Sequence, residues 1–231
     1  MTALAREKGW PANVVFMGMG EPLLNLEGVV PALEALADEE RFALGARRIT
    51  VSTAGVSPAI LKLAECPARP KLALSLNSPF DYQRDQLMPI NRKYPLREVI
   101  KACKAYSEKT GRRIFIEYVL ISGVNTSAEM ARELGRIAEY LGAEVNLIAF
   151  NPVEGCEFRT PEREDVRRFR AILESLHIGV TERFRRGLDI TAGCGQLKGK
   201  HPEKVKRAPA ESPAAGTVKT RRPKPTGDAH G

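Results

Sequence analysis

The sequence RRITVSTAGVSPAILKLAECPARPKLALSLN, residues 47–77, contains two short apolar runs with a helical segment between them. Residues 48–55 are rich in β-branched side chains and end at Gly55, as a buried strand that enters a turn does. Residues 58–65 have the apolar spacing of a short helix, and residues 71–77 form the second apolar run. A strand, a helix and a strand in this order predict a unit with two parallel strands.

The alternation of strand and helix extends over most of the chain. An apolar run at residues 13–17 breaks at the turn Gly18-Met-Gly-Glu-Pro22, and a helical pattern follows through Leu36. Further expected elements are strands at residues 114–121, 145–150 and 179–184, helices at residues 95–109, 128–141 and 161–176, and a loop at residues 78–94. The last helix is expected to open at Thr160.

Most of the expected strands are near-continuous apolar runs without polar alternation. Such runs are typical of a parallel sheet that helices cover, so the sequence predicts an α/β fold. The units fit either an open doubly wound sheet or a barrel. In both folds a ligand binds at the carboxyl ends of the strands.

Composition predicts one folded domain and a tail. The 231 residues are 43% hydrophobic, which is enough for a single sizeable core. Residues 200–231 are rich in Pro, Ala, Lys and Gly, and they hold eight Lys and Arg against three Asp and Glu, out of a net charge of +8. We predict a folded part at residues 1–199 and a disordered tail at residues 200–231, with a solvated tail favoured over an RNA-binding arm.

The N-terminal sequence has no apolar run long enough for a signal peptide or a membrane span, which favours a cytoplasmic protein. The cysteines are widely spaced, at positions 66, 103, 156 and 194. We expect all four to be thiols, because no export signal accompanies them. The first three have no spacing suited to a metal and are interpreted as structural. Cys194 lies between two glycines, which would expose its side chain.

Small, polar and acidic residues are expected at the ends of the strands. They are Gly18 to Glu21, Ser52 and Thr53, Ser75 to Asn77, Glu117, and Asn151. Because the carboxyl ends of parallel strands lie at one edge of a sheet, these groups are expected to line a site for a polar ligand that carries amine, carboxylate and hydroxyl groups.

Seven strings occur along residues 10–200 in a fixed order: GMGEPLLN at 18–25, RRITVSTAGV at 47–56, LALSLN at 72–77, MPINRKYPL at 88–96, IEYVLISGVN at 116–125, VNLIAFNP at 145–152 and CGQL at 194–197. Together they resemble the radical-SAM 23S ribosomal RNA adenine-C2 methyltransferases, some of which also modify transfer RNA. The resemblance implies that residues 1–199 form part of a TIM-like (β/α)6 barrel. It also implies an electron donor for the whole enzyme.

The resemblance implies a set of residues that contact S-adenosylmethionine. They are Gly20, Glu21, Ser52, Ser75, Leu76, Asn77 and Asn151. Glu21 would hold the ammonium group of this ligand, and the polar strand ends would bind its ribose and carboxylate. Cys194 would accept a methyl group from one S-adenosylmethionine, and a deoxyadenosyl radical from a second molecule would turn that methyl into a radical that adds to carbon 2 of adenine.

In the family that the chain resembles, a CxxxCxxC loop upstream of GMGEPL holds a [4Fe-4S] cluster. The sequence contains no such triplet, and only 17 residues precede Gly18. The resemblance therefore implies that the first barrel strand and the cluster loop are missing, through an incomplete gene model or a truncated or split protein, and that the chain is inactive alone. There are two alternatives. The chain is a remnant that binds S-adenosylmethionine or RNA without catalysis, or it serves another radical-SAM reaction on the same barrel.

Overall fold

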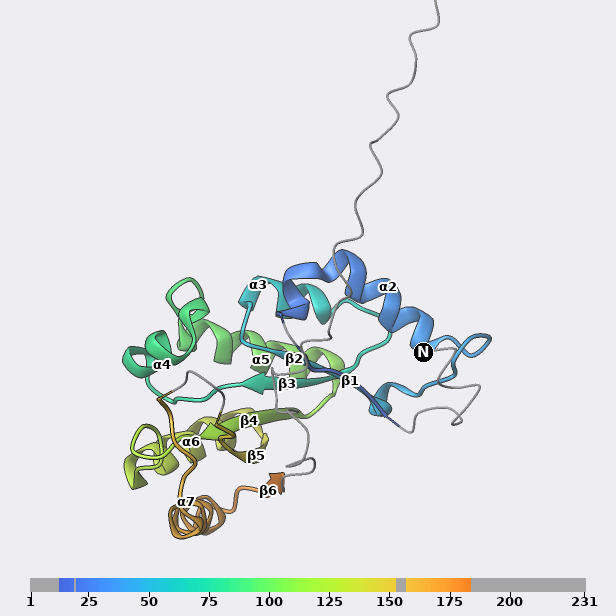
Figure 1. Ribbon diagram of the computed structural model, residues 1–231. Helices are drawn as coiled ribbons and strands as arrows, with labels where there is room; N and C mark the ends of the chain where they lie inside the picture. The colour runs from blue at the N-terminus through green and yellow to red at the C-terminus, as the bar shows by residue number, and fades with distance from the viewer. Residues whose placement is uncertain (1–12, 19, 153–156, 184–231) are drawn as a thin grey trace, which may run out of the picture. The chain divides into compact units, whose positions relative to one another are not determined.

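The computed structural model describes residues 13–18, 20–152 and 157–183. They form a six-stranded sheet whose strands are all parallel and follow the order β1-β2-β3-β4-β5-β6 (Figure 1). The strands are β1 Val14–Phe16, β2 Ile49–Thr53, β3 Lys71–Ser75, β4 Ile114–Leu120, β5 Glu144–Ala149 and β6 Val180–Arg183. A doubly wound sheet reverses its strand order at one point. The described strands do not, so the sheet is of the singly wound, barrel-like kind.

Helices connect successive strands. They are η1 Pro22–Asn25, α2 Leu26–Ala37, η2 Ala46–Arg48, α3 Ser57–Leu63, α4 Asp81–Leu87, η3 Pro89–Arg92, α5 Leu96–Thr110, α6 Ala128–Leu141 and α7 Arg163–Ser175. Right-handed crossovers that always advance in one direction place their helices on the same face of a sheet. Contacts of α3 with α5, and of α6 with both α5 and α7, agree with one continuous helical layer.

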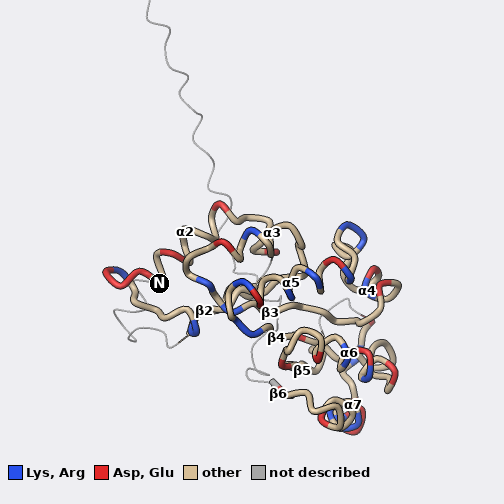
Figure 2. The backbone as a smooth tube through the Cα atoms, turned by 180° about the vertical axis from the view of Figure 1, so that it is seen from behind, with Lys and Arg blue, Asp and Glu red and all other residues tan. Residues whose placement is uncertain are grey.

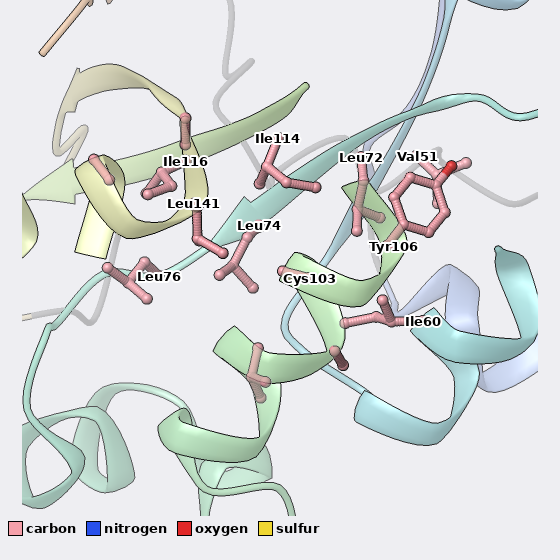
Figure 3. Close-up of a cluster of buried hydrophobic side chains, with 14 of the residues drawn as sticks. Val51, Ile60, Leu72, Leu74, Leu76, Cys103, Tyr106, Ile114, Ile116 and Leu141 are labelled. Atoms are coloured by element: carbon pink, nitrogen blue, oxygen red, sulfur yellow. The ribbon is translucent and has the colours of Figure 1, made fainter. Parts of the chain in front are cut away.

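The hydrophobic core lies between the sheet and this helical layer (Figure 3). Alternate residues of β3 and β4 point into it, among them Leu72, Leu74, Ile114 and Ile116. Because side chains alternate along a strand, the residues between them face the other side of the sheet. The sheet therefore has an apolar face against the helices and a second face on which a ligand can lie.

Most of the expected elements match the structure to within two residues, and α6 matches at both ends. The expected loop at residues 78–94 is wrong, because it contains α4 and η3. The buried side chain of α4 is Arg84, so this helix has no apolar stripe for a pattern to reveal. Thr160 does not cap α7: its hydroxyl donates to the Phe150 carbonyl (3.0 Å), and Glu162 occupies the capping position.

None of the helices within the described ranges combines the length and the apolar character that a membrane crossing requires.

Alkaline pH is expected to destabilise the fold through the buried thiol of Cys103 on α5. Burial raises the pKa of this thiol to about 12, against the opposing effect of the Arg84 charge. The unfolded thiol loses its proton near pH 9. The contribution of Cys103 to the free energy of unfolding is therefore fully present below pH 9 and is lost as the pH rises toward 12. The slope is about 1.4 kcal/mol per pH unit for one group. Urea unfolding at pH 8 to 10 measures it, and Cys103→Ala should flatten the dependence. An identical slope in both proteins would contradict this assignment.

A candidate ligand site at the carboxyl ends of the strands

Glu21 joins the carboxyl ends of β1 and β2. One of its carboxylate oxygens accepts from the Leu23 backbone N–H (3.0 Å), which caps η1. The other oxygen accepts from the Ala54 N–H, just after β2 (2.6 Å). The turn before Glu21 contains Gly20, whose φ of +100° favours glycine. A Cβ atom added at Gly20 would meet nothing within 4 Å, so a ligand has room to approach the backbone here.

Ser52 and Ser75 lie side by side on the face of the sheet that points away from the helices. Their hydroxyl oxygens are 3.4 Å apart, and both side chains are half-buried. On the same strands, Val51 and Leu74 point into the helical core. The structure therefore brings together two of the residues that the sequence predicted as contacts.

The polar surface continues from Ser75 across the next strands. Ser75 is opposite Glu117 in the register of β3 and β4, and Glu117 is opposite Asn146 in the register of β4 and β5. The Asn146 amide donates to Glu117 Oε1 (2.9 Å), and the Thr181 hydroxyl is hydrogen-bonded to Asn146 Oδ1. These residues form a polar row from β2 to β6, defined here as Ser52, Ser75, Glu117, Asn146 and Thr181.

Glu117 is 5% exposed, and it is the one acidic residue classed as buried among the described residues. The expected place of Glu117 at a strand end is wrong, because Glu117 lies in the middle of β4. Glu117 was not predicted to contact the ligand, and Asn146 and Thr181 were not predicted at all. An asparagine in the middle of an apolar strand was the available signal, because alternation places Asn146 on the face opposite Val145 and Leu147.

Asn77 follows β3 in the left-handed region, at φ +56°. Its Oδ1 accepts from the Val119 N–H (3.0 Å), and its Nδ2 donates to the Met88 sulfur (3.4 Å). Asn77 therefore holds the end of β3 against β4. Its neighbour Leu76 is fully buried with its side chain in the core (Figure 3), so only backbone atoms of Leu76 can reach a ligand.

Asn151 follows β5 at the same edge of the sheet and is half-buried. Cys194, Cys156 and residues 200–231 lie outside the described residues. Cys66 and Cys103 are buried, and burial raises the pKa of both thiols. A buried, protonated thiol is a poor nucleophile and a poor metal ligand, which agrees with the structural role predicted for both.

The residues of this chain do not fit a [4Fe-4S] cluster. The full sequence holds no CxxxCxxC triplet. Within the part of the chain that the structure describes, no group of three or more His, Cys, Asp or Glu could hold a metal ion. S-adenosylmethionine is different, because its amine and hydroxyl groups match the carboxylate, hydroxyl and amide groups at the strand ends.

A separate cavity of 680 Å³ lies among η1, α2 and α3, where Leu24, Val30 and Lys62 are among the lining residues. None of the strand-end residues named above lines it. The chemistry-bearing groups are those of the polar row and the Gly20-Glu21 turn, so we place the candidate site there.

Known proteins similar to this chain share its fold and sequence. The dual-specificity RNA methyltransferase RlmN of Geotalea uraniireducens (strain Rf4) is 46% identical over 194 residues, which are 84% of this chain and 56% of that protein. The probable dual-specificity RNA methyltransferase RlmN of Desulfitobacterium hafniense (strain Y51) is 48% identical over 186 residues, 80% of this chain and 52% of that protein. The chain thus spans about half the length of these curated relatives.

The crystal structure of a radical SAM methyltransferase from Sphaerobacter thermophilus superposes with a TM-score of 0.80 at 48% identity. The match covers 85% of this chain and 58% of that one, which confirms the expected fold class. Members of this superfamily use S-adenosylmethionine and a [4Fe-4S] cluster. Residues 2–134 match the family model of the Radical SAM superfamily, and the chain belongs to that superfamily.

Proposed function

We propose that this chain is the barrel part of a radical SAM RNA methyltransferase. The whole enzyme would methylate carbon 2 of an adenine in 23S ribosomal RNA or in transfer RNA. It would act in the cytoplasm and would receive electrons from a cellular donor. The observation that carries the proposal is the polar row beside the Gly20-Glu21 turn. The relatives named as RNA methyltransferases support the choice of RNA as substrate.

In this proposal Glu21 binds the ammonium group of S-adenosylmethionine. Each carboxylate oxygen can accept about two hydrogen bonds. One position on each oxygen is used by the Leu23 and Ala54 N–H groups, which hold the carboxylate in place. The remaining positions can accept from an ammonium group in a fixed orientation.

Ser52 and Ser75 would bind the ribose hydroxyls, since two hydroxyls 3.4 Å apart can exchange one mutual hydrogen bond for bonds to a vicinal diol. Asn151 and the backbone at Leu76 and Asn77 complete the proposed contacts. S-adenosylmethionine supplies the methyl group, and Cys194 would take it onto its sulfur: the S–CH₃ bond of the cysteine forms as the sulfonium–methyl bond breaks, which releases S-adenosylhomocysteine.

Removal of the two serine hydroxyls is expected to weaken S-adenosylmethionine binding. Each lost hydrogen bond contributes about 0.5–1.5 kcal/mol, so the Ser52→Ala, Ser75→Ala double variant should bind roughly 5-fold to 150-fold more weakly. Isothermal titration of the full chain measures the affinity. Ser175→Ala is the matched control, because this hydroxyl bonds the Ile172 carbonyl on the exposed part of α7. The site assignment fails if the unsubstituted chain does not bind, or if the double variant binds as tightly.

A second candidate is an RNA-binding module without catalysis, which the net charge of +8 favours. Within the described residues, basic and acidic residues are mixed along α7 (Figure 2). Arg167 pairs with Glu164, and Arg168 pairs with Asp165. RNA affinity of such a module would fall steeply with salt as counterions are released. A titration of RNA binding against salt concentration tests this, and an affinity that is absent at low salt excludes it.

A further inference from the structure

We propose that Arg84 is a positioning residue for the S-adenosylmethionine site, because its guanidinium holds together the carboxyl ends of β2 and β3. This inference rests on the proposed function. Arg84 comes from α4, the helix that the sequence pattern did not reveal, and Figure 1 shows α4 beyond the arrowhead of β3.

The Arg84 side chain is fully buried and makes four hydrogen bonds. Nε donates to the Leu76 carbonyl (3.0 Å), and Nη2 donates to the carbonyls of Ala54 (2.6 Å) and Ser75 (3.2 Å). Nη1 donates to Asn91 Oδ1 (2.6 Å). Three of the four acceptors are therefore backbone carbonyls at the ends of two neighbouring strands.

These carbonyls belong to the residues that build the candidate site. Ser75 carries one of the two paired hydroxyls, and Ala54 donates its own N–H to the Glu21 carboxylate. Ala54 thus accepts from Arg84 on one side and donates to Glu21 on the other. Through these bonds the guanidinium fixes the relative positions of the Glu21 carboxylate and the two serine hydroxyls.

A ring of polar groups supports the guanidinium. The Asn91 amide, which accepts from Arg84, donates to Asp81 Oδ1 (2.8 Å) and Asp85 Oδ1 (2.7 Å). Burial lowers the pKa of the Arg84 guanidinium, and the charges of Asp81 and Asp85 offset part of this effect. Asp81 also accepts from the Leu96 N–H (2.9 Å) at the start of α5.

Buried charges often stabilise a fold less than well-packed apolar side chains of similar volume. An apolar residue at position 84 would fill the space but leave the carbonyls of Ala54, Ser75 and Leu76 without this planar donor. The fork of an arginine can satisfy several acceptors in one plane, which a lysine ammonium cannot. We therefore infer that Arg84 serves to place the two strand ends relative to each other and does not serve stability alone.

Arg84→Lys tests this role in the full chain, because lysine keeps the charge and loses the planar fork. Titration with S-adenosylmethionine should show about 10-fold weaker binding in the otherwise unsubstituted chain. In the Ser52→Ala, Ser75→Ala background the same change should weaken binding less than about 3-fold, since residues that act through one another are not additive.

Tyr106→Phe is the matched control. The Tyr106 hydroxyl is buried and donates to the Pro70 carbonyl (2.6 Å), which lies at the amino end of β3. This variant also loses a buried side-chain bond to the backbone of the same strand, but at the opposite end. It should lower the urea midpoint while its affinity for S-adenosylmethionine stays within about twofold.

Several outcomes separate the possibilities. Unchanged binding by Arg84→Lys overturns the positioning role. An equal loss in both serine backgrounds overturns it as well, because the proposed role acts through the serine hydroxyls and not through Glu21 alone. If the unsubstituted chain does not bind S-adenosylmethionine, both the proposed site and the role of Arg84 are wrong. If Arg84→Lys does not fold, the same cycle is run with Asn91→Ser, which leaves Arg84 in place, and additivity there overturns the role equally.

Discussion

Replacement of Cys194 with alanine should abolish methyl transfer to RNA, provided that the cluster ligands are supplied. Because this sequence has no CxxxCxxC triplet, the assay uses a chimera in which residues 10–200 replace the matching part of the Geotalea uraniireducens relative, which is 46% identical. In the proposed role the sulfur of Cys194 would carry the methyl group, so the role is covalent. Loss of a covalent nucleophile reduces rates by more than roughly 1,000-fold.

The measurement is methyl incorporation into ribosomal RNA and transfer RNA, with mass spectrometry of the Cys194 peptide for the added methyl group. Cys66→Ala and Cys103→Ala are the controls, because both thiols are buried and protonated. They should retain methylation, although Cys103→Ala is expected to lower stability. Methylation by the Cys194→Ala chimera at the rate of the unsubstituted chimera would end the assignment.

Asn125→Ala should unfold the protein or bring it close to unfolding. Asn125 is fully buried just after β4. Its Oδ1 accepts from the Ile121 N–H (2.7 Å), and its Nδ2 donates to the carbonyls of Asn77 (2.8 Å) and Val119 (2.7 Å). Alanine leaves one N–H and two carbonyls buried without these partners. At about 1–3 kcal/mol each, the loss is comparable with the whole stability of a typical domain, about 5–15 kcal/mol.

Urea unfolding followed by circular dichroism measures this loss. Asn125→Asp should be at least as severe, because its second carboxylate oxygen would face the carbonyls of Asn77 and Val119. Asn151→Ala is the matched control: Asn151 is only half-buried after β5, so its urea midpoint should change little while S-adenosylmethionine binding weakens. Equal midpoints for the Asn125 and Asn151 variants would show that the buried amide is not needed.

The sequence was most informative where apolar periodicity was strong. The six strands and helices α5, α6 and α7 bury apolar side chains at regular spacing, so their positions could be predicted. Helix α4 could not, since its inward side chain is Arg84, and a charged residue reads as exposed in any hydropathy pattern.

The residues of the candidate site also differ in how far the sequence could predict them. Ser52, Ser75 and Glu21 follow directly from strand ends and from family resemblance. Alternation along β5 could have placed Asn146 on the polar face, but its pairing with Glu117 and Thr181 depends on the register between strands, which periodicity does not reveal. Asn125 is part of a string used to identify the family, yet its bond to the Asn77 carbonyl, 48 positions earlier, is visible only in the structure.

The simple order of the sheet also bears on how the chain is made. Each described strand from β2 to β6 pairs with the strand that precedes it in the sequence, so none of these five must wait for a distant segment to be synthesised. Chains grow from the ribosome more slowly than a short segment can dock, and their N-terminal parts fold first. Each new strand and helix can therefore extend a sheet that already exists, and a nascent chain halted after β4 should already hold Arg84 against the ends of β2 and β3.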